Sequence, residues 1–295
     1  MKTALLVIAA LAVASAEWID IDWSRVKPIE EFDHYWGRIP KEWQFLRKLT
    51  PSRRITNGWE AAPGQFPYQI AVLIAFSDGD GLCGGSVLTR NYILTAAHCV
   101  VNAQRGVAVI GAHDRTVNEA SQQRIEFSIS GIRIHEGYTP TNTRNDVAVV
   151  RLNSVITFNE RVQPVRIPAA GDNRQFAGSI GTVSGFGRWS DSSPNTAAIL
   201  RYTSNPLLTE ADCLARWSHN TNVIQPQNIC MSGDGGRSAC HGDSGGPMTI
   251  FENGNTVQVG IVSFGSSAGC SIGMPSVYVR ITHFRQWIVS NSDYS

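Results

Sequence analysis

Three short segments carry residue types that could do chemistry together. TAAHC at 95–99, NDVAVV at 145–150 and GDSGGP at 242–247 place a histidine, an aspartate and a serine in that order, namely His98, Asp146 and Ser244. A serine hydroxyl becomes a nucleophile when a histidine takes its proton, and an aspartate holds that imidazole in the required tautomer and stabilises its cation. Each motif alone has an ordinary structural explanation. Together they predict a serine endopeptidase.

The elements that must position these residues are short β-branched runs broken by Gly, Asn and Pro. Their spacing predicts an all-β architecture, although periodicity alone does not separate a barrel from a sandwich. At 281–292, Ile281, Phe284, Trp287 and Ile288 recur at helical spacing and predict a closing helix. The runs are QIAVLIAF (69–76), SVLTRNYILTAA (86–97), GVAVIGAH (106–113), VAVVRL (147–152), SIGTVSGFG (179–187), PMTIF (247–251), VQVGIVSF (257–264) and SVYVRI (276–281).

Longer stretches of the chain resemble a known family. They are ITNG at 55–58, LCGGSVLTRNYILTAAHCV at 82–100, DVAVVRL at 146–152, GDSGGP at 242–247 and VSFGSSAGC at 262–270. From residue 55 to about 290 the sequence resembles the chymotrypsin family of serine proteases, and within it the arthropod brachyurin-like kind. The resemblance implies two six-stranded antiparallel β-barrels, at about 55–165 and 166–281, with the closing helix at about 281–292. It also implies an active site in the cleft between the barrels.

The N-terminus predicts the compartment. Lys2, an apolar run at 4–13 and Ala14-Ser15-Ala16 are typical of a signal peptide covering residues 1–16. The run is too short to span a bilayer, and no later stretch approaches the roughly 20 apolar residues that a membrane helix needs. The formal net charge of +1 gives no electrostatic reason to expect nucleic acid as a partner. We therefore expect a secreted, extracellular monomer that binds neither nucleic acid nor a membrane.

All six cysteines lie between positions 83 and 270, which in an oxidising compartment predicts three disulfides. Sequence alone leaves about 15 pairings open. The resemblance implies Cys83 with Cys99, Cys213 with Cys230, and Cys240 with Cys270. A metal site is not expected, because no CxxC pair is present and the oxidising compartment disfavours thiolate ligands.

We expect no cofactor either. The loop at 111–123 resembles the family's calcium loop, but Ala112 replaces one carboxylate ligand and Gln122 or Gln123 replaces another. A hard cation needs several oxygen ligands, so this loop is not expected to hold calcium.

Residues 17–54 differ in character and are interpreted as a propeptide. Ser52-Arg53-Arg54 precedes Ile55, so cleavage after Arg54 would free an α-amino group on Ile55. The resemblance implies that this amine pairs with the Asp243 carboxylate inside the protein. Leaving one charge of a buried ion pair without its partner destabilises the folded protein by about 3–5 kcal/mol. Before cleavage, the loop at 240–244 is therefore expected to be poorly shaped for catalysis.

The composition of the propeptide leaves two interpretations open. It has no cysteine and contains four of the eight tryptophans, Trp18, Trp23, Trp36 and Trp43. Aromatic side chains usually bury area against something, which favours docking on the rest of the protein. The alternative is a mostly disordered leader. Every lysine of the chain lies at or before position 48, for which we have no physical account.

The resemblance also assigns the groups around the nucleophile. The backbone N–H groups of Gly242 and Ser244 would form an oxyanion hole, and a side chain at Gly242 would obstruct it. Ser263 would contact Asp146, and residues 263–265 would pair with the substrate backbone as an added strand. Phe264 stands where the family usually has tryptophan and should preserve an apolar wall.

Substrate choice is inferred from the primary pocket. Ser238 stands at its floor, where trypsin-like members carry Asp, so a substrate Arg or Lys would lose solvation without gaining an ion pair. Gly265 leaves the wall open to large rings, and Ser276 narrows the floor. We therefore expect chymotrypsin-like specificity for a large apolar or aromatic residue. A separate trypsin-like protease is then needed to cut after Arg54.

The competing hypothesis is a non-catalytic or regulatory homologue that acts in immunity or feeding. Non-catalytic homologues typically lack a member of the triad, whereas His98, Asp146 and Ser244 are all present here. We therefore expect an active enzyme whose partners are protein or peptide substrates and protein inhibitors. Brachyurin-like relatives suggest digestive or broad proteolysis, with collagen among the substrates.

Overall fold

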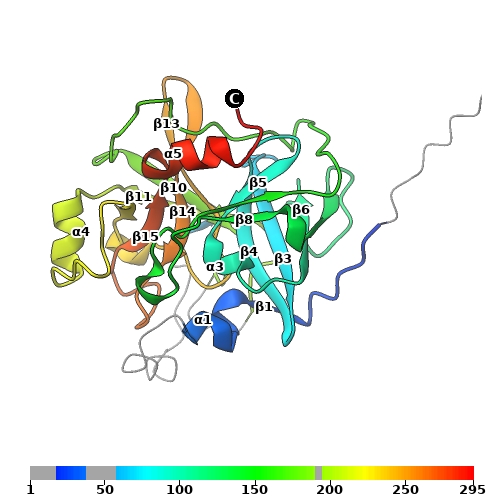
Figure 1. Cartoon of the computed structure of the whole chain (residues 1–295), viewed down its shortest axis with the longest axis horizontal. Helices are drawn as coiled ribbons and strands as arrows, with labels where there is room; N and C mark the ends of the chain where they lie inside the picture. The colour runs from blue at the N-terminus through cyan, green and yellow to red at the C-terminus, as the bar shows by residue number, and fades with distance from the viewer. Residues whose placement is uncertain (1–17, 38–57, 190–194) are drawn as a thin grey trace, which may run out of the picture.

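A computed structural model of the chain describes residues 18–37, 58–189 and 195–295. Two curled, mainly antiparallel sheets form the framework of these ranges, with few helices (Figure 1). The predicted all-β fold with two curled antiparallel units is confirmed, and the described strands form sheets of eight and seven where six each were expected. The expected signal peptide at 1–16 and the expected cleavage site at Arg54 and Ile55 lie outside the described residues.

The first sheet runs in the order β7-β6-β3-β4-β5-β9-β8, and neighbouring strands in this order are antiparallel. Its central strand β3 is the apolar run QIAVLIAF, whose residues are buried on both faces except for Ala75. The strands are β3 (Gln69–Phe76), β4 (Gly79–Val87), β5 (Tyr92–Thr95), β6 (Arg105–Ile110), β7 (Gln123–Ser128), β8 (Ile132–Ile134) and β9 (Ala148–Arg151).

The second sheet runs in the order β12-β15-β14-β13-β10-β11-β2. The short strand β2 precedes β3 and the six strands that continue the first sheet from it, yet it pairs with β11 through Trp59 and Tyr202. The segment that follows residue 58 is thereby tied to the second sheet. The strands are β2 (Trp59–Glu60), β10 (Ile180–Gly185), β11 (Arg201–Pro206), β12 (Asn228–Met231), β13 (Pro247–Glu252), β14 (Asn255–Phe264) and β15 (Ser276–Arg280).

The C-terminal helix α5 spans Ile281–Ser290 and agrees with the expected helix. Its buried residues Ile281, Phe284 and Ile288 share one face, because residues three and four apart on a helix align. They join a core cluster that also contains residues of the first sheet. The other helical segments are η1 (Ile29–Glu31), α1 (Asp33–Gly37), α3 (Ala97–Val100), η3 (Ile129–Gly131), η4 (Thr141–Thr143), α4 (Glu210–Arg216) and η5 (Asp234–Gly236).

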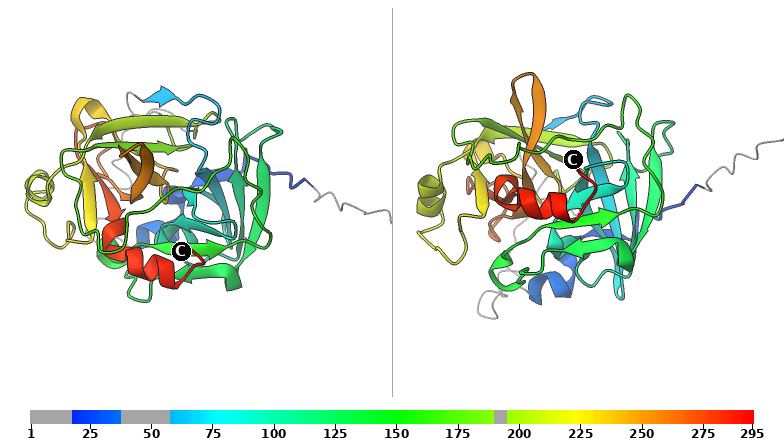
Figure 2. Two further views of the ribbon diagram at one scale, coloured as in Figure 1. Left: turned by 90° about the horizontal axis from the view of Figure 1, so that it is seen from above. Right: turned by 45° about the horizontal axis from the view of Figure 1, so that its top comes forward.

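Residues 18–37, which we call the leader segment, lie against the first sheet. Strand β1 (Val26–Pro28) pairs in parallel with β4, with Val26 opposite Asp80 and Pro28 opposite Leu82. Helix α1 then lies beside α3 on the side of the molecule opposite α5 (Figures 1 and 2). Ile29 is fully buried by this arrangement. Of the two interpretations left open by the sequence, the described part of the segment adopts the docked one.

No helix within the described ranges is both long and apolar enough to cross a membrane.

Candidate active site

His98 and Asp146 meet at the ends of two neighbouring strands. His98 lies in α3 directly after β5, and Asp146 precedes β9, which pairs with β5. The His98 Nδ1 atom is 2.8 Å from Asp146 Oδ2, and the His98 backbone N–H donates to Asp146 Oδ1 at 2.9 Å. Both side chains are buried. The carboxylate therefore fixes both the backbone and the ring of His98, as a catalytic base requires.

Ser263 completes the surroundings of the aspartate. It lies near the end of β14, is fully buried, and donates from Oγ to Asp146 Oδ2 at 2.6 Å. A buried carboxylate needs hydrogen-bond donors to offset its lost hydration. Asp146 receives them from the His98 backbone and Ser263, and His98 Nδ1 lies within hydrogen-bond distance. The structure thus brings together three of the residues selected from the sequence.

Ser244 lies on a loop packed tightly against the first sheet. The Gly84 N–H donates to the Ser244 carbonyl at 2.7 Å, and Cys99 Sγ lies 3.4 Å from the same oxygen. Two residues earlier, Gly242 has a φ of +94°, and a Cβ there would lie 3.1 Å from Gly187 Cα. Only glycine adopts this backbone conformation readily. The sequence GDSG therefore permits a turn that presents the Gly242 N–H and the Ser244 hydroxyl together.

Both of these donors are directed at a residue that sequence reasoning missed. The Ser244 hydroxyl donates to Glu30 Oε1 at 2.6 Å, and the Gly242 N–H donates to Glu30 Oε2 at 2.9 Å. Glu30 belongs to η1 of the leader segment and has only 6% of its surface exposed. No motif surrounds this glutamate. The only signal in the sequence was the density of aromatic residues around it, which suggested docking but not a position.

Asp243, between these two donors, is buried and accepts hydrogen bonds from two loops. The Gly187 N–H donates to its Oδ1 at 2.8 Å and the Cys240 N–H to its Oδ2 at 2.9 Å. Burial raises the pKa of Asp243 to about 7, the two backbone donors oppose this rise, and the Glu30 charge adds to it. The loop was expected to be poorly shaped before cleavage. In the full chain it is instead held by these bonds and by Glu30.

The residues assigned to the primary pocket lie on the second sheet and its loops. Ser238 is buried and donates to the Ala239 carbonyl at 2.9 Å, while Ser276 Oγ lies 2.9 Å from the Tyr278 hydroxyl. Phe264 packs edge to face against Trp217, which sequence reasoning did not select, with ring centroids 5.8 Å apart. A Cβ on Gly265 would meet nothing within 4 Å.

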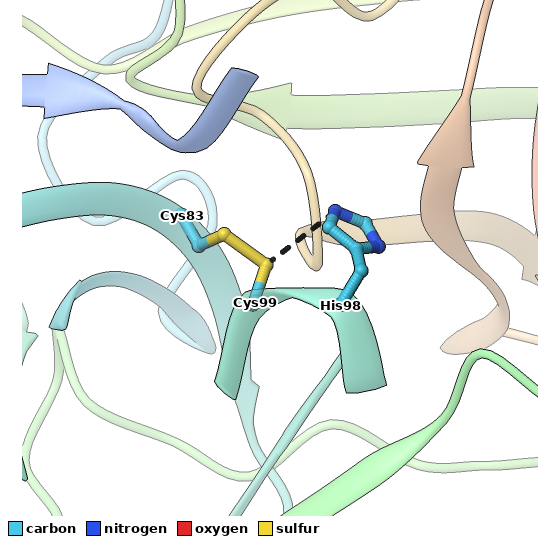
Figure 3. A group of neighbouring side chains, drawn as sticks. All are labelled: Cys83, His98 and Cys99. Carbon is cyan, nitrogen blue, oxygen red and sulfur yellow. Dashed lines mark hydrogen bonds between the residues drawn. A yellow bond between two sulfur atoms is a disulfide. The ribbon is translucent and has the colours of Figure 1, made fainter. Parts of the chain in front are cut away.

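Three disulfides join the pairs that the family resemblance implies, Cys83–Cys99, Cys213–Cys230 and Cys240–Cys270. The first lies beside His98, with Cys99 Sγ 3.7 Å from His98 Nε2 (Figure 3). These three side chains also form a compact set of potential metal-ligating atoms. The two sulfur atoms are bonded to each other, however, and thiolates are what a metal would require. The group therefore fits a braced His98 rather than a metal site.

Known proteins are similar to this chain in sequence and in fold. The family profile described as Trypsin matches residues 55–288. Chymotrypsin from Phaedon cochleariae is 35% identical and covers 100% of this chain and 99% of its own length. Brachyurin from Leptuca pugilator is 36% identical, over 79% of this chain and 96% of that protein. A solved structure of HL collagenase matches with a TM-score of 0.72 and 33% identity, covering 81% of this chain and 99% of its own.

Proposed function

Because the chain belongs to the trypsin family of serine endopeptidases, we propose that it is a secreted, chymotrypsin-like enzyme made as an inactive precursor. In its reaction His98 takes the proton of Ser244 as the hydroxyl attacks the scissile carbonyl. Asp146, held by Ser263, keeps the imidazole in place and stabilises its cation. The N–H groups of Gly242 and Ser244 receive the negative oxygen of the tetrahedral intermediate.

The buried, uncharged Ser238 is the observation that carries the specificity. A substrate Arg or Lys entering a pocket without a carboxylate at this floor would remain an uncompensated buried charge. The open space above Gly265 supports a large ring or branched side chain, and Ser276, already engaged with Tyr278, leaves a neutral floor. Peptides with Phe or Leu before the scissile bond are therefore the proposed substrates.

The proposed division of the chain is a signal peptide at 1–16, a propeptide at 17–54 and a protease domain at 55–295. Cleavage after Arg54 by a trypsin-like protease would release the Ile55 amine to pair with Asp243. The buried carboxylate with its raised pKa supports this proposal, because a nearby ammonium would stabilise its ionised form. The signal-peptide pattern and the disulfides support secretion.

Protein substrates follow from the family, and protein inhibitors and a monomeric state are proposed with it. A digestive or broad role that includes collagen is supported by relatives named brachyurin and collagenase. Neither a metal nor an organic cofactor is needed for the steps above, since protein groups supply the base, the nucleophile and the oxyanion donors.

The proposal is tested with purified precursor treated with trypsin, which is then inhibited and removed together with the freed leader. Hydrolysis is compared for peptides with Phe, Leu, Ala or Arg before the scissile bond. We expect kcat/KM to be highest for Phe and Leu and to vanish in Ser244→Ala. A preference for Arg would overturn the pocket assignment, and inactivity despite a verified Ile55 N-terminus would overturn the enzyme's proposed activation.

A further inference from the structure

The Glu30 carboxylate lies where the reaction would place oxygen atoms. One of its oxygens accepts from the Gly242 N–H, an oxyanion donor, and the other accepts from the nucleophilic hydroxyl. The acid product of peptide hydrolysis also presents a carboxylate to these two groups at the end of the reaction. Glu30 therefore imitates a bound product.

We propose that the leader segment is an active-site inhibitor carried by the chain itself, with the Glu30 carboxylate as its blocking group. We further propose that the freed leader still inhibits as a separate peptide after cleavage at Arg54. This inference rests on the proposed function and adds a specific ligand for the same site. Its second part rests on the contacts of the leader segment, because residues 17–54 contain no cysteine and only non-covalent contacts can then retain the freed leader.

Neighbouring contacts hold Glu30 in this position. The Trp36 Nε1–H donates to the Glu30 carbonyl at 2.6 Å, which closes the turn from η1 into α1. The ring of Tyr35 meets the ring of His98 edge to face, with centroids 5.7 Å apart. The segment thus covers the catalytic base as well as the nucleophile. The segment therefore excludes water and substrate from the space around His98 and Ser244.

An apolar anchor lies on either side of Glu30. Ile29 is fully buried in the core cluster of the first sheet, and the ring of Phe32 lies 5.4 Å from that of Phe76. Gly81 of β4 leaves room for Ile29, since a Cβ there would lie 2.8 Å from Phe76 Cε2 and 3.3 Å from Ile29 Cδ1. Burying the side chains of Ile29 and Phe32 would stabilise the docked segment by several kcal/mol, about 1.5–3 for each.

Charged contacts extend the docking away from the catalytic residues. The Arg115 guanidinium lies 4.3 Å from the Trp23 ring centroid, and Arg124 lies 4.1 Å from that of Trp18. Glu31 forms an ion pair with Arg188. These contacts give the segment an interaction surface that extends from β4 to β7, the loop before β7 and the loop that carries Arg188.

The blocking group itself offers the enzyme no bond to cleave. Glu30 presents a side-chain carboxylate, which contains no amide bond to cleave, and its negative charge makes the carbon a poor electrophile for Ser244. A carboxylate that accepts two donors in a site with little water also has strong, charge-assisted hydrogen bonds. Glutamine has the same shape but lacks the charge, so Glu30→Gln separates charge from size.

The test adds a synthetic peptide of residues 17–54 to cleaved, leader-free enzyme and measures hydrolysis of a Phe substrate. We expect competitive inhibition, in which the apparent KM rises and kcat is unchanged. The peptide with Glu30→Gln should inhibit at least about tenfold more weakly, because a hydrogen bond to a charged acceptor is lost. The peptide with Asp22→Asn is the matched control, since Asp22 is exposed in the same segment, and should remain within about twofold of the wild type.

A second measurement uses the intact precursor and an organophosphonate that labels the active serine. Glu30→Gln in the full chain should be labelled faster than the wild type. Absence of inhibition by the wild-type peptide, or equal inhibition by the Glu30→Gln peptide, would overturn the proposal. Failure of the proposed function would look different, because leader-free enzyme would then not hydrolyse the substrate even without any peptide.

Discussion

Ser263 offers a direct test of how the triad aspartate is held. Its hydroxyl is one of the donors to Asp146 Oδ2, and no water can replace it easily because the residue is fully buried. A hydrogen bond to a charged group contributes roughly 1.5–3 kcal/mol, so we expect Ser263→Ala to lower kcat by about ten- to a hundredfold. KM should change little, because the lost bond acts on the aspartate and not on the substrate.

Steady-state kinetics on the cleaved enzyme would measure this effect. Ser266→Ala is a suitable control, since Ser266 lies on the same segment and its hydroxyl accepts a hydrogen bond from the nearby Ala268 N–H. A change in KM alone, or an equal effect of both substitutions, would show that Ser263 does not act through Asp146.

Individual residues differed in how well their sequence context revealed them. His98, Asp146 and Ser244 could be selected because their chemistry requires fixed neighbours, such as the glycines around Ser244. Ser263 followed from a motif match. Glu30 could not be selected, because a lone glutamate has no local pattern. Its role appears only when its own segment docks on the Ser244 loop, 214 positions away in the chain.

At the scale of elements, Asp243 joins the loop of the nucleophile to the loop after β10. The pKa of Asp243 is about 7 in the folded protein and has its ordinary value of 3.8 in the unfolded chain. The folded protein therefore keeps this proton at pH values where the unfolded chain has released it. A raised pKa of an acid means that the folded state binds the proton more tightly. This contribution to the free energy of unfolding is therefore complete below about pH 4 and is lost as the pH rises through 7.

The uncleaved precursor should consequently lose about 2–3 kcal/mol of stability between pH 5 and pH 8 that an Asp243→Asn precursor does not lose. Urea unfolding at both pH values, with both proteins, measures the difference. The asparagine is a control because it keeps the shape and has no titrating proton, while its single amide oxygen accepts from one of the two backbone donors. An equal loss in both proteins would assign the pH dependence to other groups.

The strands show what pattern can and cannot predict. Strand β3 has the predicted bounds of 69–76, because a run of apolar, β-branched residues of this length favours a buried strand. Strand β11, RYTSNP, was not predicted, since its buried residues Thr203 and Asn205 are polar and their burial depends on partners in β10 and beyond. Strand β1 also escaped prediction, because a three-residue strand forms only where β4 offers an edge.

At the scale of the whole molecule, the distribution of lysine provides a test of activation. Residues 55–295 contain no lysine, so the chain cut after Arg54 would have a single primary amine, that of Ile55. Cyanate applied to the cleaved, leader-free enzyme should abolish activity in proportion to the modification of this one amine. Breaking a buried ion pair costs roughly 3–5 kcal/mol, which corresponds to about a hundred- to a thousandfold loss of activity.

The order of treatment is the control for that experiment. Cyanate applied to the intact precursor modifies only its N-terminal amine and lysines at or before position 48, all of which leave with the leader. Precursor modified first and cleaved afterwards should therefore be fully active. Loss of activity in either order would mean that the reagent acts elsewhere, and activity retained in both would remove Ile55 from the mechanism.

The parallel pairing of β1 with β4 has a consequence for storage of the protein at high concentration. Residues 80–82 of β4 would otherwise present free backbone groups, and Phe76 would lose its contact with the Phe32 ring. Such an edge is a template on which another copy of the chain can add a strand, and this is how many β proteins begin to aggregate. While β1 is in place this edge is covered, so we expect the protein to aggregate more readily at high concentration once the leader has gone.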